Sequence, residues 1–161
     1  MGNLSRHADA VARVPDKAAI AIVPWLDAET AALLQATIAS VACQHLALRA
    51  AVLYGSVARH DERPLTDHQP SDVDLLLVFE RRQAQPVDFT VAQMTAIFGS
   101  VNEALMCYPH APREVQVMLA TEDLADWDET FVRNVQRDGV LLWARSELHG
   151  PLAVLLQASA T

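Results

Sequence analysis

The strongest structural signal in the chain is residues 71–79, Ser-Asp-Val-Asp-Leu-Leu-Leu-Val-Phe. From Val73 onward, apolar side chains occupy both alternating sets of positions, which is typical of a strand covered by protein on both faces. A second apolar run, residues 51–54, stops at Gly55 and predicts another buried strand that ends in a tight turn. Residues 60–71 lie between the two strands, and their polar and proline-containing sequence indicates a loop. We therefore expect a sheet with residues 73–79 near its centre.

The remaining elements alternate along the chain. Apolar spacing of three to four residues predicts helices over 27–49, 88–106 and 128–137, and a shorter helix is expected over 121–125. Alternating patterns predict strands over 114–119 and 140–143. The order helix, strand, strand, helix, strand, helix, strand predicts an α/β or α+β domain, in which a mixed β-sheet is packed with helices.

The composition fits one domain. The chain has 161 residues, of which 52% are hydrophobic and 20% charged, a balance that favours one continuous apolar core over disorder. We expect an irregular N-terminal arm over 1–26, the domain itself over 27–145, and a C-terminal tail over 146–161 that forms at most a short helix.

The net charge narrows the range of partners. A formal charge of -8 would repel a long phosphate backbone, so nucleic acid is not expected as a main partner. A nucleotide stays compatible, because a bound divalent cation reverses the local field. The sequence contains no apolar run of about 18 residues and no convincing signal peptide, so we expect no membrane partner and a cytoplasmic protein.

Gly55 and Ser56 stand where the first strand gives way to a helical turn over 56–59. Glycine lets an anion approach the backbone closely, and the following amides point outward with the positive end of the helix dipole. Ser56 adds a hydroxyl donor. A Gly-Ser pair alone is more often an ordinary turn, so its meaning depends on its neighbours.

Asp72 and Asp74 provide that context. Because they are two residues apart at the start of a strand, they project from one face with Cα atoms roughly 6.5 to 7 Å apart. Two carboxylates at about 4 Å and an effective dielectric near 20 repel by about 4 kcal/mol, so they need a shared cation or a proton. Oxygen ligands of this kind suit Mg²⁺. The alternative is a turn-capping Asp72 beside a merely exposed Asp74.

The joint pattern resembles the minimal nucleotidyltransferases. Gly55-Ser56-Val57-Ala58-Arg59 is similar to their G-S-x-A-R block, and Ser71-Asp72-Val73-Asp74-Leu75 is similar to their S-D-x-D-L block. The segment from Thr121 to Trp143 also resembles that family's closing segment. The resemblance implies the nucleotidyltransferase fold, related to that of DNA polymerase beta. It also implies Mg²⁺ on Asp72 and Asp74, triphosphate contacts from Gly55 and Ser56, and ATP as donor.

Two further assignments follow from the resemblance. Arg59 either contacts phosphate or is a solvated helix arginine. The family has a third acid on the next strand, and that position falls on Gln116, which cannot accept a proton. Glu114 lies two residues away on the same face, and three alternatives stay open. Glu114 replaces the missing acid as a catalytic residue and metal ligand, the centre is weakened or inactive, or the predicted strand register is misplaced. The first block also departs from the family, which has glycine where this chain has His60.

Three hypotheses about function remain. In the first, the protein transfers a nucleoside monophosphate from a nucleoside triphosphate to an acceptor hydroxyl. The resemblance implies either a protein tyrosine, as when such a domain silences a paired toxin of the HEPN type, or a small hydroxylated compound, and we favour the protein partner. In the second, Gln116 marks a degenerate fold that binds nucleotide or a partner without turnover. In the third, the motifs are accidental features of an interaction domain.

Overall fold

A four-stranded mixed sheet forms the centre of the molecule in the computed structural model, which describes residues 19–81, 89–125 and 127–157. The strands are β1 (Leu48–Tyr54), β2 (Val73–Phe79), β3 (Val115–Thr121) and β4 (Val140–Ala144). Their order is β3-β2-β1-β4, in which β1 runs antiparallel to β2 and β4, whereas β2 and β3 are parallel. The predicted central place of residues 73–79 is confirmed.

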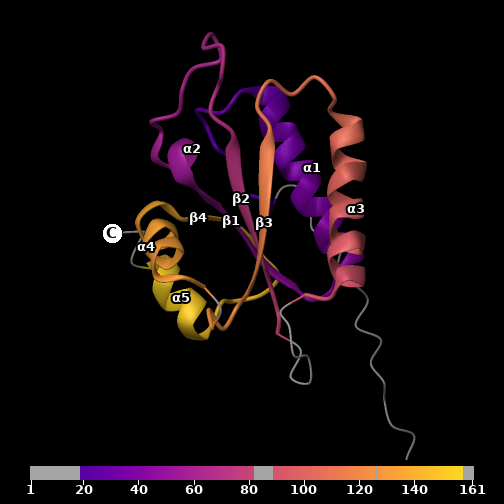
Figure 1. Ribbon diagram of the computed structural model, residues 1–161, viewed down its shortest axis with the longest axis vertical. Coiled ribbons are helices and arrows are strands. Elements are labelled where there is room, and N and C mark those ends of the chain that lie inside the picture. Colours follow the sequence, from indigo (N-terminus) through magenta and orange to yellow (C-terminus); the bar gives the residue numbers. More distant parts are fainter. Residues whose placement is uncertain (1–18, 82–88, 126, 158–161) are drawn as a thin grey trace, which may run out of the picture.

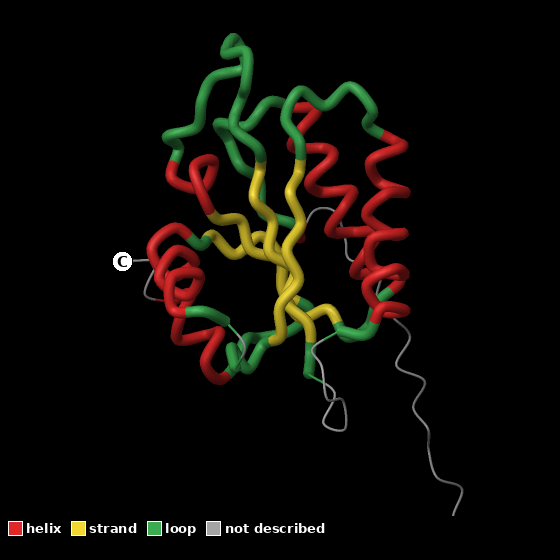
Figure 2. Tube along the Cα trace, in the orientation of Figure 1, coloured by secondary structure: helices red, strands yellow, loops and turns green. Residues whose placement is uncertain are grey.

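Helices cover both faces of this sheet (Figure 1). One face packs against α1 (Ala28–Gln44) and α3 (Val91–Cys107), and the other against α4 (Glu129–Asp138) and α5 (Gly150–Gln157). The short helix α2 (Gly55–Arg59) follows β1 directly. Figure 2 shows the same arrangement as layers of helix, strand and helix. The predicted α+β class with a mixed sheet is confirmed.

The alternation of side chains along the strands explains the two layers. Leu53 and Leu75 lie in the core beneath α1 and α3, whereas Val52 and Leu76 lie in the core beneath α4 and α5. All four are fully buried. Because successive strand residues point to opposite faces, a run that is apolar at every position needs both helix layers.

Capping residues set the starts of the long helices. Asp27 accepts a hydrogen bond from the Thr30 amide at the start of α1, and Asp128 does the same for the amide of Phe131 in α4. Thr90 caps α3 and shares a capping box with Gln93.

The predicted end of the first helix and the predicted short helix over 121–125 are wrong. The first helix ends at Gln44 rather than near residue 49, because the chain enters β1 at Leu48 and the β-sheet hydrogen bonds take over there. Of residues 121–125, where a short helix was predicted, Thr121 ends β3 and the following residues form turns. Leu124 has a φ of 60°, which a right-handed helix cannot contain. The carboxylate of Asp123 accepts a hydrogen bond from the Ala125 amide and satisfies the backbone locally.

Both ends of the described chain join the core. Ile20 and Val23 are buried, and the Ala21 amide donates to the Leu142 carbonyl of β4. Residues 146–157 include α5, whose Leu152 is 1% exposed. The rest of the expected arm, residues 1–18, and the last four residues of the expected tail lie outside the described residues. Within the described part of the chain, no helix is both long enough and apolar enough to cross a bilayer.

Candidate functional site

Three strands bring the predicted site residues to one edge of the sheet. Because β1 runs antiparallel to β2 and β2 parallel to β3, the end of β1 meets the beginnings of the other two. The register places Asp74 opposite Tyr54 on one side and opposite Gln116 on the other. Gly55 follows Tyr54 and opens α2 (Figure 1). The glycine corner and the acidic pair therefore lie side by side.

Gly55 touches the Asp74 carboxylate. Its φ is 78°, a left-handed conformation that glycine adopts without strain, and an added Cβ would lie 2.2 Å from Oδ2 of Asp74. A side chain at this position would force the Asp74 carboxylate to move. The corner thus needs glycine for two reasons, and Asp74 is held directly beside the amides that begin α2.

The two aspartates influence each other electrostatically. The pKa of Asp74 is raised, first by its partial burial and next by the negative charge of Asp72, while the charge of Arg59 acts in the opposite direction. Asp72 itself is exposed. Among the described residues, neither carboxylate accepts a hydrogen bond or forms an ion pair with a basic side chain. Asp74 is therefore a half-buried acid without a hydrogen-bond or ion-pair partner in the described chain, and the assignment of Asp72 and Asp74 as Mg²⁺ ligands stays a prediction.

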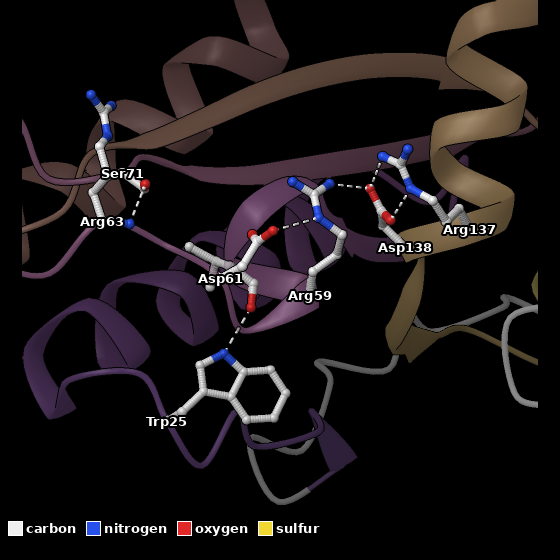
Figure 3. Close-up of polar contacts among 8 residues, drawn as sticks. Trp25, Arg59, Asp61, Arg63, Ser71, Arg137 and Asp138 are labelled. Atoms are coloured by element: carbon white, nitrogen blue, oxygen red, sulfur yellow. Dashed lines mark hydrogen bonds and ion pairs between the residues drawn. The ribbon is translucent and has the colours of Figure 1, made fainter.

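Arg59 is engaged elsewhere in this structure. Its guanidinium donates from Nη1 to Oδ2 of Asp138 at 2.6 Å and from Nε to Oδ2 of Asp61 at 3.1 Å (Figure 3). The hydrogen bonds that Arg59 donates to Asp61 and to Asp138 raise its pKa. A phosphate contact by Arg59 stays a prediction, because here the side chain joins α2 to the end of α4.

Asp138 is a site-supporting residue that the sequence analysis did not identify. Its side chain is 1% exposed and accepts hydrogen bonds from Arg59 and, at 2.6 and 2.8 Å, from Arg137 (Figure 3). The hydrogen bond from Arg137, followed by that from Arg59, lowers the pKa of Asp138 despite its burial. Asp138 thereby fixes α2 against α4. The only signal in the sequence was an acidic residue directly before the Gly139 that precedes β4.

The third acid is not assembled with the first two. Glu114 lies just before β3, where its backbone carbonyl accepts from the Val73 amide at 2.8 Å. Its Oε2 accepts a hydrogen bond from Nε2 of Gln116 at 3.3 Å. Within residues 19–81, 89–125 and 127–157, no three His, Cys, Asp or Glu side chains are grouped closely enough to hold a metal ion. The role of Glu114 as the third metal ligand and catalytic acid therefore stays a prediction, and this structure does not show the cluster that it requires.

Residues before and after α2 hold the corner in place. Nε1 of Trp25 donates to the Val57 carbonyl at 2.7 Å, and the Trp25 ring stacks on His60 at 4.9 Å between centroids. Figure 3 shows Trp25 reaching α2 from below. His60 ends α2 with a φ of 57°. Its left-handed conformation explains why glycine suits this position in the family that the sequence resembles.

Tyr54 was also missed by the sequence analysis. The residue is half-buried beside Asp74, and burial together with the charge of Asp74 raises the pKa of its phenol to about 12. Its ring contacts Phe131 edge to face, with 5.6 Å between centroids. The sequence signal was only an aromatic residue next to the strand-ending glycine.

The fold and site together define a class: an α+β domain in which a strand-ending glycine corner lies against a pair of aspartates on the neighbouring strand. No protein family model matches the chain, and no curated protein matches it. Among solved structures, it is similar to a proposed nucleotidyltransferase from Sulfolobus solfataricus, with 22% identity, a TM-score of 0.46, and coverage of 77% of this chain and 90% of the other. It is also similar to a toxin–antitoxin structure with AMP-PNP, with 14% identity, a TM-score of 0.45, and coverage of 79% and 81%.

Proposed function

We propose that the protein is a Mg²⁺-dependent nucleotidyltransferase that uses a nucleoside triphosphate, with ATP as the expected donor. One observation carries this proposal. Asp74 lies against the backbone of Gly55, beside the charge of Asp72, and no basic side chain of the described chain pairs with it. A cation held by both carboxylates would restore the charge balance and place a phosphate over the glycine corner.

The chemistry follows from that placement. An acceptor oxygen would form a bond to the α-phosphorus, and the bond from that phosphorus to the bridging oxygen would break. Pyrophosphate would leave with the bonding electrons, and the acceptor proton would pass to a base, for which Glu114 is the nearest candidate by sequence. Gly55 and Ser56 would bind the triphosphate through backbone amides and a hydroxyl. The protein would contribute placement and charge rather than a covalent intermediate.

For the acceptor, we favour a hydroxyl on a partner protein, such as the tyrosine of a HEPN-type partner, over a small hydroxylated compound. The motif resemblance suggests both classes. The neighbour that is a toxin–antitoxin structure with AMP-PNP is compatible with the first class. Pyrophosphate release should be measured with purified protein, labelled ATP, Mg²⁺ and candidate acceptors of both kinds. Release from the wild type that disappears in Asp74→Asn supports the proposal.

A second candidate function has its own observation. Gln116 stands opposite Asp74 on β3, where a third carboxylate would complete a metal centre, and the described residues contain no three-acid cluster. A nucleotide-binding or partner-binding module without turnover would fit this site. Binding of ATP with no release of pyrophosphate under any condition would favour the module. If activity is lost in Asp74→Asn but kept in Glu114→Gln, the protein is an enzyme and Glu114 is not its third acid.

A further inference from the structure

A polar cavity lies beside Asp72, and neither Asp74 nor Gly55 is among the residues that line it. Its volume is about 440 Å³. Residues from the loop before β2 and from the segment before β3 line it, namely Arg63, Gln69, Pro70, Asp72, Pro112, Arg113 and Glu114. Gly55 follows β1, whereas the cavity is lined by residues that precede β2 and β3, and β2 lies between β1 and β3 in the sheet.

Arg113 forms the inner part of the cavity and has no acidic partner in the described chain. The residue is 6% exposed, and its Nη1 donates to the Ser71 carbonyl at 2.8 Å. Its backbone amide contacts Oγ1 of Thr30 at 3.4 Å. No ion pair with an aspartate or glutamate is present among residues 19–81, 89–125 and 127–157. A buried guanidinium with one carbonyl acceptor still has N–H donors to offer to an anion.

Arg63 supplies a second positive charge at the mouth of the cavity. Its backbone is fixed to Ser71: the Arg63 amide donates to Oγ of Ser71 at 2.7 Å (Figure 3). The Arg63 carbonyl also accepts from the Ser71 amide at 3.5 Å. The guanidinium forms no ion pair within the described residues. Ser71 thus ties both arginines to the start of β2, one through its hydroxyl and one through its carbonyl.

We propose that this cavity binds an anionic group, a phosphate or carboxylate, of the acceptor substrate. The inference rests on the proposed nucleotidyl transfer, because in-line displacement requires the attacking and leaving oxygens to lie on opposite sides of the α-phosphorus. If pyrophosphate leaves over Gly55, the acceptor approaches from the β3 side. There, Arg63 and Arg113 would hold its anionic group, and Asp72, which lines the same cavity, would help to hold the Mg²⁺ of the nucleotide.

Inorganic phosphate is a suitable probe of the cavity. The full-length chain, labelled with ¹⁵N, would be titrated with phosphate in EDTA, and then again with Mg²⁺ and AMP-PNP bound. We expect amide shifts at residues 113–116 in both titrations. Arg63→Gln should weaken phosphate binding about tenfold, because it removes a charge-assisted hydrogen bond. Arg113→Lys should weaken it similarly, since one ammonium cannot replace the planar guanidinium in holding both the Ser71 carbonyl and an anion.

Control variants distinguish a failure of the proposed anion site from a failure of the nucleotidyltransferase assignment. Arg133→Gln removes an exposed arginine of α4 whose ion pair among the described residues is with Glu129, and should leave phosphate affinity unchanged. Arg63 is also exposed, so Arg63→Gln tests the cavity even if the Arg113 variant fails to fold. Unchanged phosphate affinity in Arg63→Gln, or phosphate shifts confined to residues 55–57, would overturn the proposal. Displacement of phosphate by Mg²⁺ and AMP-PNP would also overturn it, because the arginines would then serve the donor. If AMP-PNP does not bind while phosphate still shifts residues 113–116, the nucleotidyltransferase assignment fails and the anion site stands.

Discussion

Replacing Asp74 with asparagine is expected to stabilise the metal-free protein and to abolish its stabilisation by Mg²⁺. Partial burial and the nearby charge of Asp72 both raise the pKa of Asp74, so its ionised form is less favourable in the folded protein than in the unfolded chain. Asparagine has nearly the same shape and no charge. The substitution therefore removes the cost of burying a charge and the repulsion from Asp72, and no hydrogen bond to the carboxylate is lost within the described residues.

The size of the effect follows from the strand geometry. Side chains two residues apart on one strand face lie roughly 6.5 to 7 Å apart, so two unit charges repel by about 0.6 kcal/mol at the dielectric of water and about 2.5 kcal/mol at an effective dielectric of 20. Because Asp72 is exposed, solvent screens the pair toward the lower value. We expect Asp74→Asn to increase the free energy of unfolding by about 1 kcal/mol at neutral pH in EDTA.

The pH dependence has a definite sign. Because the folded-state pKa of Asp74 lies above the ordinary value of 3.8, the folded protein holds this proton more tightly than the unfolded chain. Stability of the wild type therefore falls as pH rises from that ordinary value through the raised pKa. The advantage of Asp74→Asn should be full above the raised pKa and should vanish toward pH 3.8.

Urea unfolding in EDTA would measure the stabilisation by Asp74→Asn, and urea unfolding in Mg²⁺ would measure the stabilisation by the metal. A Mg²⁺ concentration ten times the dissociation constant should add about 1.4 kcal/mol to the wild type and nothing to Asp74→Asn. Glu147→Gln is a matched control, since it removes one of the negative charges from an exposed position without a described contact. A variant less stable than the wild type in EDTA, or one that Mg²⁺ stabilises as much as the wild type, would refute this account of the site.

Three further predictions concern the same region. Gly55→Ala should lower the free energy of unfolding by about 1 to 2 kcal/mol and abolish nucleotide binding by calorimetry, because its Cβ would collide with the carboxylate of Asp74. Asp138→Asn should cost about 1 to 3 kcal/mol at pH 7 in urea unfolding. Since its two arginines lower the pKa of Asp138, the wild-type advantage should be present above the unfolded-state pKa and be lost as the pH falls through the lowered folded-state pKa. Gln116→Asp should tighten Mg²⁺ binding about tenfold in titration calorimetry. If Glu114 is the third ligand, Glu114→Gln should weaken Mg²⁺ binding by a similar factor. Equal Mg²⁺ affinity in Glu114→Gln and the wild type would show that Glu114 is not a metal ligand.

The sequence was sufficient to predict the sheet and the pairing of the glycine corner with the acids. The reason is that both depend on local patterns: an uninterrupted apolar run requires two covering layers, and a two-residue spacing sets one strand face. The turns at residues 122–125 could not be predicted in the same way. There, the side chain of Asp123 competes with helical hydrogen bonds, and the outcome depends on Arg81, which bonds to both Thr121 and Asp123 across the strand end.

The contacts of the arginines at the site also could not be predicted from local sequence patterns. Arg59 was open to two interpretations, and the structure adds a third, because its partner Asp138 lies 79 positions away in the sequence. Arg113 carried no signal at all, since its position between Ser71 and Thr30 depends on the packing of three elements. Long-range ion pairs, and buried arginines that lack an acidic partner in the described chain, are consequences of the fold and leave no periodicity in the sequence.

The parallel register of β2 and β3 limits what Glu114 can do. Asp74 pairs with Gln116 and Val73 with Val115, so Glu114 stands beside Asp72, one residue before the strand pairing begins. Two positions along a strand amount to roughly 6.5 to 7 Å, and the additional methylene of glutamate spans only about 1.5 Å of that distance. Glu114 therefore cannot take the place of an acid at position 116 with the metal ion unmoved. If Glu114 is a ligand, the ion lies toward Asp72 and the arginine-lined cavity that both residues line.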